Sequence, residues 1–127
     1  MARTAPPHYH PVMQGGPALE IQSESVGNAT VLSPKGDIDM ARSPVLRKAI
    51  GDAMKEKPGK LLLDLSGVPY MDSSGLATLV EALQNARKSQ LPLLICGLTP
   101  RVKSILEIAR LNTVFSVHAD RTAALGA

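Results

Sequence analysis

A short polar segment at residues 71–75, Met-Asp-Ser-Ser-Gly, carries the side chains best suited to chemistry in this chain. It lies between an apolar run at residues 60–65 and a stretch with helical spacing that begins at Leu76. A strand-to-helix junction of this kind exposes hydroxyl groups beside the unpaired N–H groups of a helix N-terminus, where a negative group such as phosphate is stabilised. We therefore interpret the segment as a switch site, with Ser73 and Ser74 as its hydroxyl residues.

The residues around this segment argue against catalysis. An exposed serine on a strand-to-helix turn also describes the nucleophile elbow of a hydrolase, but that motif needs glycine where Met71 stands, two residues before Ser73. The only histidine downstream is His118, in an expected terminal strand. The chain also lacks the phosphate-binding sequence G-x-x-x-x-G-K-[ST]. We expect no enzyme activity and no cofactor, so a phosphate would have to be added covalently by another protein.

The composition predicts one small domain. The chain has 127 residues, of which 44% are hydrophobic and 20% charged, which suits a single core and is too little for two domains. Aromatic residues make up only 2% and tryptophan is absent, so the core must be aliphatic, with few stacking surfaces for bases or sugars. The single cysteine, Cys96, lies in the apolar segment 93–96, where we expect it to be a small buried side chain.

Charge and hydropathy bear on partners and location. The formal net charge is +3, but the basic residues are spread along the chain, so no nucleic-acid partner is predicted. Arg101, Lys103 and Arg110 fall on one expected helix, and we interpret them as its solvated outer face. No apolar run approaches the ~18 residues of a membrane span, and residues 1–16 hold no signal-peptide core. A cytoplasmic protein without membrane contact is expected.

The N-terminal segment is predicted to be a flexible tail. Residues 1–17 are rich in proline and glycine and have no periodic apolar pattern, so the folded domain is expected at residues 18–127. His8 and His10 flank Tyr9 in this tail. Two histidines without a third ligand on an ordered scaffold do not define a metal site, and none is predicted.

Apolar periodicity in the rest of the chain predicts strands that alternate with helices. The expected elements are a strand at 19–26, a turn at 26–29, a strand at 30–33, a helix with Ser43 as N-cap and Pro44 at its first position, a strand at 60–65, a helix at 76–88, a strand at 93–96, a helix that starts at Thr99 and Pro100, a strand at 114–117 and a short helix from Asp120. The first two strands would form an antiparallel hairpin. This α/β order, β-β-α-β-α-β-α-β, predicts a mixed, mostly parallel sheet of about five strands covered by three to four helices.

Two motifs add a family resemblance to this order of elements. They are residues 63–76, Leu-Asp-Leu-Ser-Gly-Val-Pro-Tyr-Met-Asp-Ser-Ser-Gly-Leu, and residues 36–39, Gly-Asp-Ile-Asp. With the element order they resemble the STAS family, the domain of bacterial anti-sigma factor antagonists and of sulfate-transporter tails, over roughly residues 18–119. In free-standing antagonists of this family, the serine directly after the motif aspartate is phosphorylated by an anti-sigma factor that is itself a kinase. That serine corresponds to Ser73.

The resemblance implies a switch between protein partners. The unmodified protein would bind the anti-sigma factor kinase and so free a sigma factor for transcription. Phosphorylation of Ser73 would release this partner, and a separate phosphatase would restore binding. The resemblance also implies that the 36–39 loop lies beside the switch segment. The partner-binding and switch residues are then Asp37, Asp39, Asp72, Ser73, Ser74 and Gly75.

Several alternatives stay open at this point. Ser73 could be only a helix N-cap, and Asp39 could equally be a helix-start carboxylate before Ser43. Ser74 is expected to support the loop from the first helical turn, and Gly75 to permit tight packing. Because one fold can carry several functions, a STAS protein could also be a scaffold subunit of a larger signalling or lipid-transport complex, without a sigma-factor role.

Overall fold

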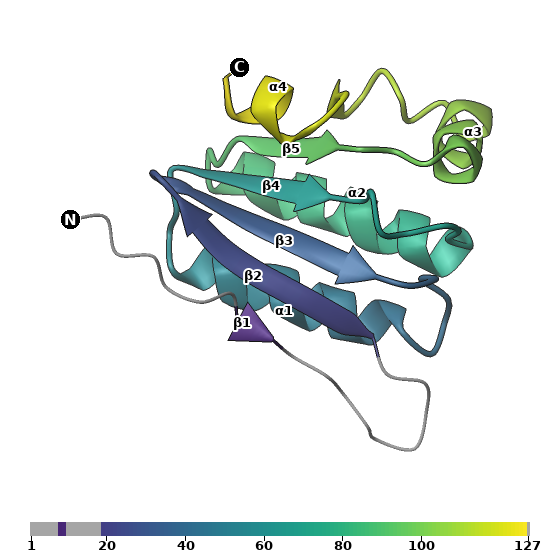
Figure 1. Ribbon diagram of the computed structural model, residues 1–127, viewed down its shortest axis with the longest axis horizontal. Helices are drawn as coiled ribbons and strands as arrows, with labels where there is room; N and C mark the ends of the chain where they lie inside the picture. Colours follow the sequence, from purple (N-terminus) through teal and green to yellow (C-terminus); the bar gives the residue numbers. More distant parts are fainter. Residues whose placement is uncertain (1–7, 10–18, 127) are drawn as a thin grey trace.

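The computed structural model of this chain describes residues 8–9 and 19–126 (Figure 1). Most of the predicted tail at residues 1–17, including His10, lies outside the described residues. The described part of that tail is strand β1 (His8–Tyr9), which pairs antiparallel with β2 (Glu20–Val26). The tail thus contributes one short strand to the edge of the sheet.

One sheet of six strands runs through the molecule in the order β1-β2-β3-β4-β5-β6. After β1 and β2 come β3 (Ala29–Lys35), β4 (Lys60–Asp64), β5 (Leu93–Cys96) and β6 (Ser116–His118). β2 and β3 form the predicted antiparallel hairpin, and β3 to β6 are parallel. The predicted fold class is therefore confirmed, and β1 is an added edge strand.

Two helices cover one face of the sheet, α1 (Ser43–Lys55) and α2 (Ser73–Lys88), as Figure 1 shows. A third helix, α3 (Pro100–Ile108), lies beside the end of the sheet, and a short α4 (Arg121–Leu125) lies against β4, β5 and β6. The short helix after Asp120 and the helix after Thr99 are therefore present as predicted.

Some predicted boundaries are wrong. Ser43 is not the N-cap of α1, because Arg42 holds that position and Ser43 is buried in the first turn. The turn begins earlier, since the main-chain oxygen of Asp39 already accepts hydrogen bonds from the N–H groups of Arg42 and Ser43. The last strand was expected at 114–117 but is Ser116–His118, because the N–H groups of Val114 and Phe115 bond to a carbonyl in the preceding turn.

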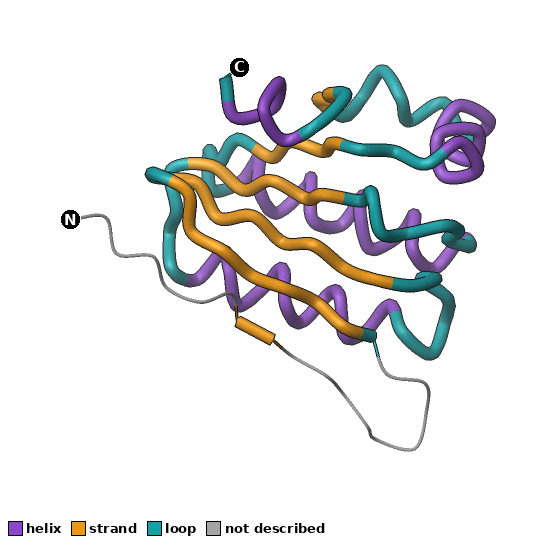
Figure 2. Tube along the Cα trace, in the orientation of Figure 1, coloured by secondary structure: helices purple, strands orange, loops and turns teal. Residues whose placement is uncertain are grey.

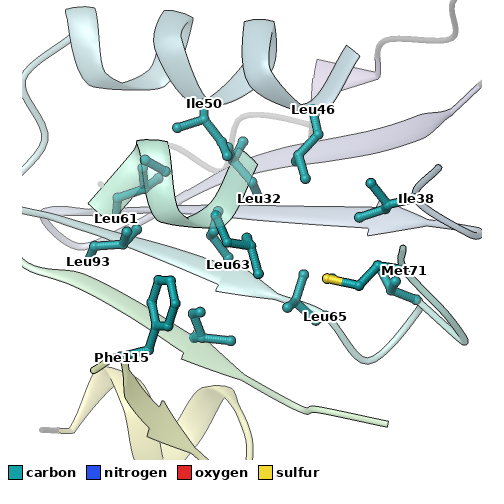
Figure 3. Close-up of a cluster of buried hydrophobic side chains, with 14 of the residues drawn as sticks. Leu32, Ile38, Leu46, Ile50, Leu61, Leu63, Leu65, Met71, Leu93 and Phe115 are labelled. Carbon is teal, nitrogen blue, oxygen red and sulfur yellow. The ribbon is translucent and has the colours of Figure 1, made fainter. Parts of the chain in front are cut away.

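The main core fills the space between the sheet and the two helices. It is aliphatic, as predicted, apart from Phe115, and Figure 3 shows side chains of α1 meeting those of the central strands. Alternate residues of β4 face this core, so Leu61 and Leu63 are fully buried there. Burial of each such leucine contributes about 1.5–3 kcal/mol. This packing fixes the carboxyl end of β4, from which the loop to the switch segment departs.

A second, smaller core lies on the opposite face of the sheet, where α4 contributes Ala124 beside Val31, Leu62 and Leu94. Cys96 belongs to this cluster and is fully buried, as its apolar neighbours predicted. Burial raises the pKa of its thiol to about 11. Among the described helices, none combines the length and apolar character needed to cross a membrane.

Arg121 links α4 to three strands through side-chain hydrogen bonds. Its Nε lies 2.7 Å from Asp64 Oδ2, its Nη1 3.0 Å from Glu24 Oε1, and its Nη2 2.7 Å from Ser33 Oγ. The other carboxylate oxygen of Asp64 accepts a hydrogen bond of 3.1 Å from the N–H of Ser66. One buried carboxylate therefore links α4 to the first residues of the loop that leads to the switch segment.

Candidate functional site

Asp72 organises the start of α2. It is the N-cap residue, and its Oδ1 accepts hydrogen bonds from Ser74 N at 2.8 Å, from Gly75 N at 3.4 Å and from Ser74 Oγ at 2.6 Å. These bonds satisfy main-chain donors that the first helical turn would leave unpaired. Because of this cap, α2 begins at Ser73, three residues before the Leu76 start expected from apolar spacing. The hydroxyl of Ser74 is held by the same carboxylate.

Ser73 differs from its neighbour in both exposure and bonding. It is the first residue of α2 and is exposed. Among the hydrogen bonds of the described residues, none involves its hydroxyl. The simple capping role belongs to Asp72, so Ser73 is not needed for it. The structure therefore places one serine hydroxyl in solvent at the positive end of the helix dipole.

The 36–39 loop lies directly beside the switch segment. Ile38 and Met71 form an isolated parallel bridge, with Ile38 N bonded to Tyr70 O at 3.0 Å and Asp72 N bonded to Ile38 O at 3.1 Å. Figure 2 shows both loops at the same end of the sheet, beyond β3 and β4. The adjacency that the resemblance implied is present, and it brings Asp39 and Asp72 to neighbouring positions after the bridge.

Asp39 also has the alternative role considered for it, that of a carboxylate at the start of the helix before Ser43. Its Oδ1 accepts hydrogen bonds from the N–H groups of Ala41 at 3.1 Å and Arg42 at 3.0 Å, ahead of α1. Its Oδ2 lies 2.8 Å from Arg42 Nη1, so a cation balances part of its charge. The next residue, Met40, is 78% exposed. Asp37, two residues before Asp39, is exposed as well.

Gly75 is buried beneath the bridge between the two loops. A Cβ atom at this position would lie 2.9 Å from Met71 Cβ and 3.2 Å from Ile38 Cγ2, closer than ordinary packing allows. Its backbone φ is not in the left-handed region, so close packing is what requires glycine here. Gly75 therefore sets how closely the first turn of α2 approaches the bridge.

The site is anionic before any modification. The hydroxyl of Ser74 and the main-chain N–H groups of Ser74 and Gly75 lower the pKa of Asp72 below its ordinary value of 3.8. Asp72 is therefore ionised at neutral pH. The arrangement offers the exposed residue Ser73 next to Asp72, whose carboxylate is bonded to Ser74 and Gly75.

Comparison with known proteins identifies the family. The model of the STAS domain matches residues 20–124. The chain belongs to the STAS domain family. It is 34% identical over 83 residues to the anti-sigma-B factor antagonist of Listeria monocytogenes, an alignment that covers 65% of this chain and 72% of that protein.

Solved structures agree with this assignment. An anti-sigma factor antagonist from Mycobacterium paratuberculosis is 25% identical, with a TM-score of 0.76 over 85% of this chain and 92% of that one. The anti-sigma factor antagonist SpoIIAA in its unphosphorylated form is 16% identical, with a TM-score of 0.66 over 84% and 94% of the two chains. The second likeness bears on the fold alone.

Sequence reasoning did not connect α3 with the switch segment of this STAS domain. The guanidinium of Arg101 lies over the Tyr70 ring, 4.9 Å from its centroid, and Thr99 Oγ1 donates a 2.8 Å hydrogen bond to Val68 O. Arg101 was interpreted only as part of a solvated helix face. The motif residue Tyr70, two positions before Asp72, was the available signal, but its contact with α3 depends on the tertiary fold.

Loss of the Asp72 cap is expected to weaken the start of α2. In Asp72→Ala, the N–H groups of Ser74 and Gly75 lose their acceptor, so the free energy of unfolding should fall by about 1 kcal/mol. Urea unfolding at pH 7 measures this change. Asp72→Asn, which keeps an acceptor oxygen, is the matched control and should lose less; equal stability of Asp72→Ala and the parent chain would contradict the capping role.

Proposed function

We propose that this STAS domain is an anti-sigma factor antagonist that works by partner switching. The unmodified chain binds an anti-sigma factor that is also a serine kinase, and so frees a sigma factor. The kinase transfers phosphate from ATP to Ser73, the modified chain leaves, and a phosphatase returns it to the binding form. This chain supplies the surface and the acceptor hydroxyl, and the partner supplies the catalytic groups.

The observation that carries this proposal is the difference between the two serines. Ser73 is exposed, whereas the hydroxyl of Ser74 is held by Asp72 at 2.6 Å. A kinase must reach the acceptor oxygen, which favours Ser73. The names of the relatives, anti-sigma factor antagonists, support the same role.

Phosphorylation at this position would change the surface rather than the fold. A phosphoserine adds about −1.5 to −2 charges at pH 7 and three acceptor oxygens. At the N-terminus of α2 that charge is stabilised by the helix dipole, by about 0.3–1 kcal/mol at an exposed site. The same charge lies beside Asp72 and the 36–39 loop, which makes an anionic surface more anionic. A partner surface that accepts a neutral hydroxyl would then meet an unpaired negative charge.

Mapping the modified residue tests the assignment. The full chain is incubated with ATP and purified anti-sigma factor kinases of the source organism, one at a time, and the peptides are sequenced by mass spectrometry. One phosphate on Ser73 is expected. Ser73→Ala should stay unmodified, whereas Ser74→Ala should still be phosphorylated. Phosphate on Ser74, or on a residue outside the switch segment, would overturn the site.

A further inference from the structure

The surface next to the switch segment continues onto α3. A shallow hollow there is lined by Tyr70, Pro100, Arg101, Ser104 and Ile105. One turn further along the helix, Ile108 is 82% exposed, the largest exposure among the large hydrophobic residues described. Residues 101, 104 and 108 follow helical spacing, so the hollow and Ile108 lie along one side of α3.

Two contacts hold this side of α3 in a fixed relation to the switch segment. Thr99 Oγ1 donates a hydrogen bond to Val68 O, and the Arg101 guanidinium stacks over the Tyr70 ring. Tyr70 O in turn accepts a hydrogen bond from Ile38 N in the neighbouring loop. A partner that covers Ser73 and extends past Tyr70 therefore meets α3 in a defined position.

The charge of α3 is opposite to that of the switch loops. Residues 99–110 carry three cations, Arg101, Lys103 and Arg110, and one carboxylate, Glu107. Of the cations, Arg101 lies on the side of α3 that carries Ile105 and Ile108, whereas Lys103 falls on another side of the helix and Arg110 follows its end. The neighbouring loops carry Asp37, Asp39 and Asp72. This end of the domain is thus divided into an anionic half that contains Ser73 and a half around α3 that presents the cation Arg101 beside the exposed Ile108.

We propose that the surface formed by Tyr70, Arg101, Ile105 and Ile108 binds a segment of the anti-sigma factor that also contacts Ser73. This segment would carry both acidic and apolar side chains. The proposal rests on the function proposed above and adds a second contact to it. A carboxylate of the partner would pair with Arg101, and its apolar side chains would cover Ile105 and Ile108. A second copy of this chain fits less well, because a two-fold contact through this face would bring two Arg101 guanidinium groups toward each other.

The two halves have different tasks in this arrangement. Phosphate on Ser73 alters the anionic half and leaves the charge of α3 unchanged. The α3 surface therefore adds affinity for the partner in both the unmodified and the phosphorylated state. The anionic half sets the ratio between the affinities of these two states. This predicts that substitutions on α3 lower the affinity of both states by a similar factor. The ratio between the affinities of the chain with Ser73 and of the phosphomimetic Ser73→Asp should stay unchanged.

Titration calorimetry of the full chain with its anti-sigma factor kinase tests the proposal. Ile108→Asp and Arg101→Glu should each weaken binding by about tenfold, as expected for truncation or reversal at an interface hot spot. Arg87→Glu, an exposed reversal in the last turn of α2, is the matched control and should bind like the parent chain. Combining either α3 change with Ser73→Asp should give the product of the separate effects.

The outcomes separate this proposal from the one on which it rests. If the parent chain binds the kinase and Ser73→Asp releases it, but both α3 variants bind like the parent, the α3 surface is overturned and the switch stands. If no anti-sigma factor kinase binds the parent chain, both proposals fail. Self-association that is lost in Ile108→Asp, with kinase binding unchanged, would assign the surface to a second copy and also overturn the proposal.

Discussion

Replacing Ser73 by aspartate is expected to weaken binding of the chain to the anti-sigma factor kinase proposed as its partner by about 100-fold, or about 2.8 kcal/mol. The new carboxylate would stand at the exposed first position of α2, beside Asp72 and close to the 36–39 loop. Like charges placed together at an interface cost several kcal/mol. The loss should be smaller than for phosphate itself, which carries more charge. Titration calorimetry with the purified kinase measures the change.

Two control variants isolate the cause. Ser73→Ala removes the hydroxyl without adding charge and should bind within about threefold of the parent chain, because most interface residues cost less than about 1 kcal/mol of binding free energy when truncated. Ser25→Asp makes the same change of charge at an exposed position of β2, near the hairpin turn. It should bind like the parent chain. Equal affinities for Ser73→Asp and Ser73→Ala would refute the switch.

Asp64→Ala is expected to lower the free energy of unfolding by about 3 kcal/mol, the low end of what loss of one partner costs a buried ion pair. Asp64 is 8% exposed, and its removal leaves Arg121 Nε and Ser66 N without this acceptor. The loss stays at this low end because the Arg121 side chain is 35% exposed and retains Glu24 and Ser33 as partners. Glu24→Gln changes the more exposed partner of the same guanidinium and should cost less than about 1 kcal/mol. Urea unfolding compares the two variants.

The effect of Asp64 should depend on pH in a defined direction. Burial alone would raise the pKa of Asp64, but hydrogen bonds from Arg121 and Ser66 outweigh it, and the pKa lies below its ordinary 3.8. A carboxylate whose pKa is lowered in the folded state adds stability above the unfolded-state pKa and loses it as the pH falls through the folded-state pKa. The gap between the parent chain and Asp64→Ala should thus be constant near pH 7 and narrow below about pH 4. A gap that widens in acid would contradict this assignment.

The central strands of the sheet were predictable because their signals are local. The run of residues 93–96 between turn signals gave β5 with its observed ends, and the two-residue turn at Gly27 and Asn28 gave the hairpin. The last strand was placed too early because a turn holds Val114 and Phe115, and predicted helix starts were wrong where a side chain outside the apolar pattern begins the helix. Asp72 starts α2 three residues before the first periodic leucine, and Asp39 starts the turn ahead of Ser43.

The candidate site could be selected from the sequence for a different reason. The motif containing Ser73 is continuous in sequence, so spacing and family resemblance were enough to single it out. The contacts that fix its surroundings join distant residues. Arg121 meets Glu24 across 97 positions, and Thr99 meets Val68 across 31. No local pattern specifies such pairs, because each depends on how the sheet places its strands and helices.

The most direct test of the partner switch compares the unmodified full chain with the chain phosphorylated by the kinase and confirmed by mass spectrometry to carry one phosphate. Both are titrated into the same anti-sigma factor kinase under identical salt and nucleotide conditions. We expect the phosphorylated form to bind at least about 100-fold more weakly, and phosphatase treatment to restore the original affinity. Equal affinity of the two forms would contradict the account.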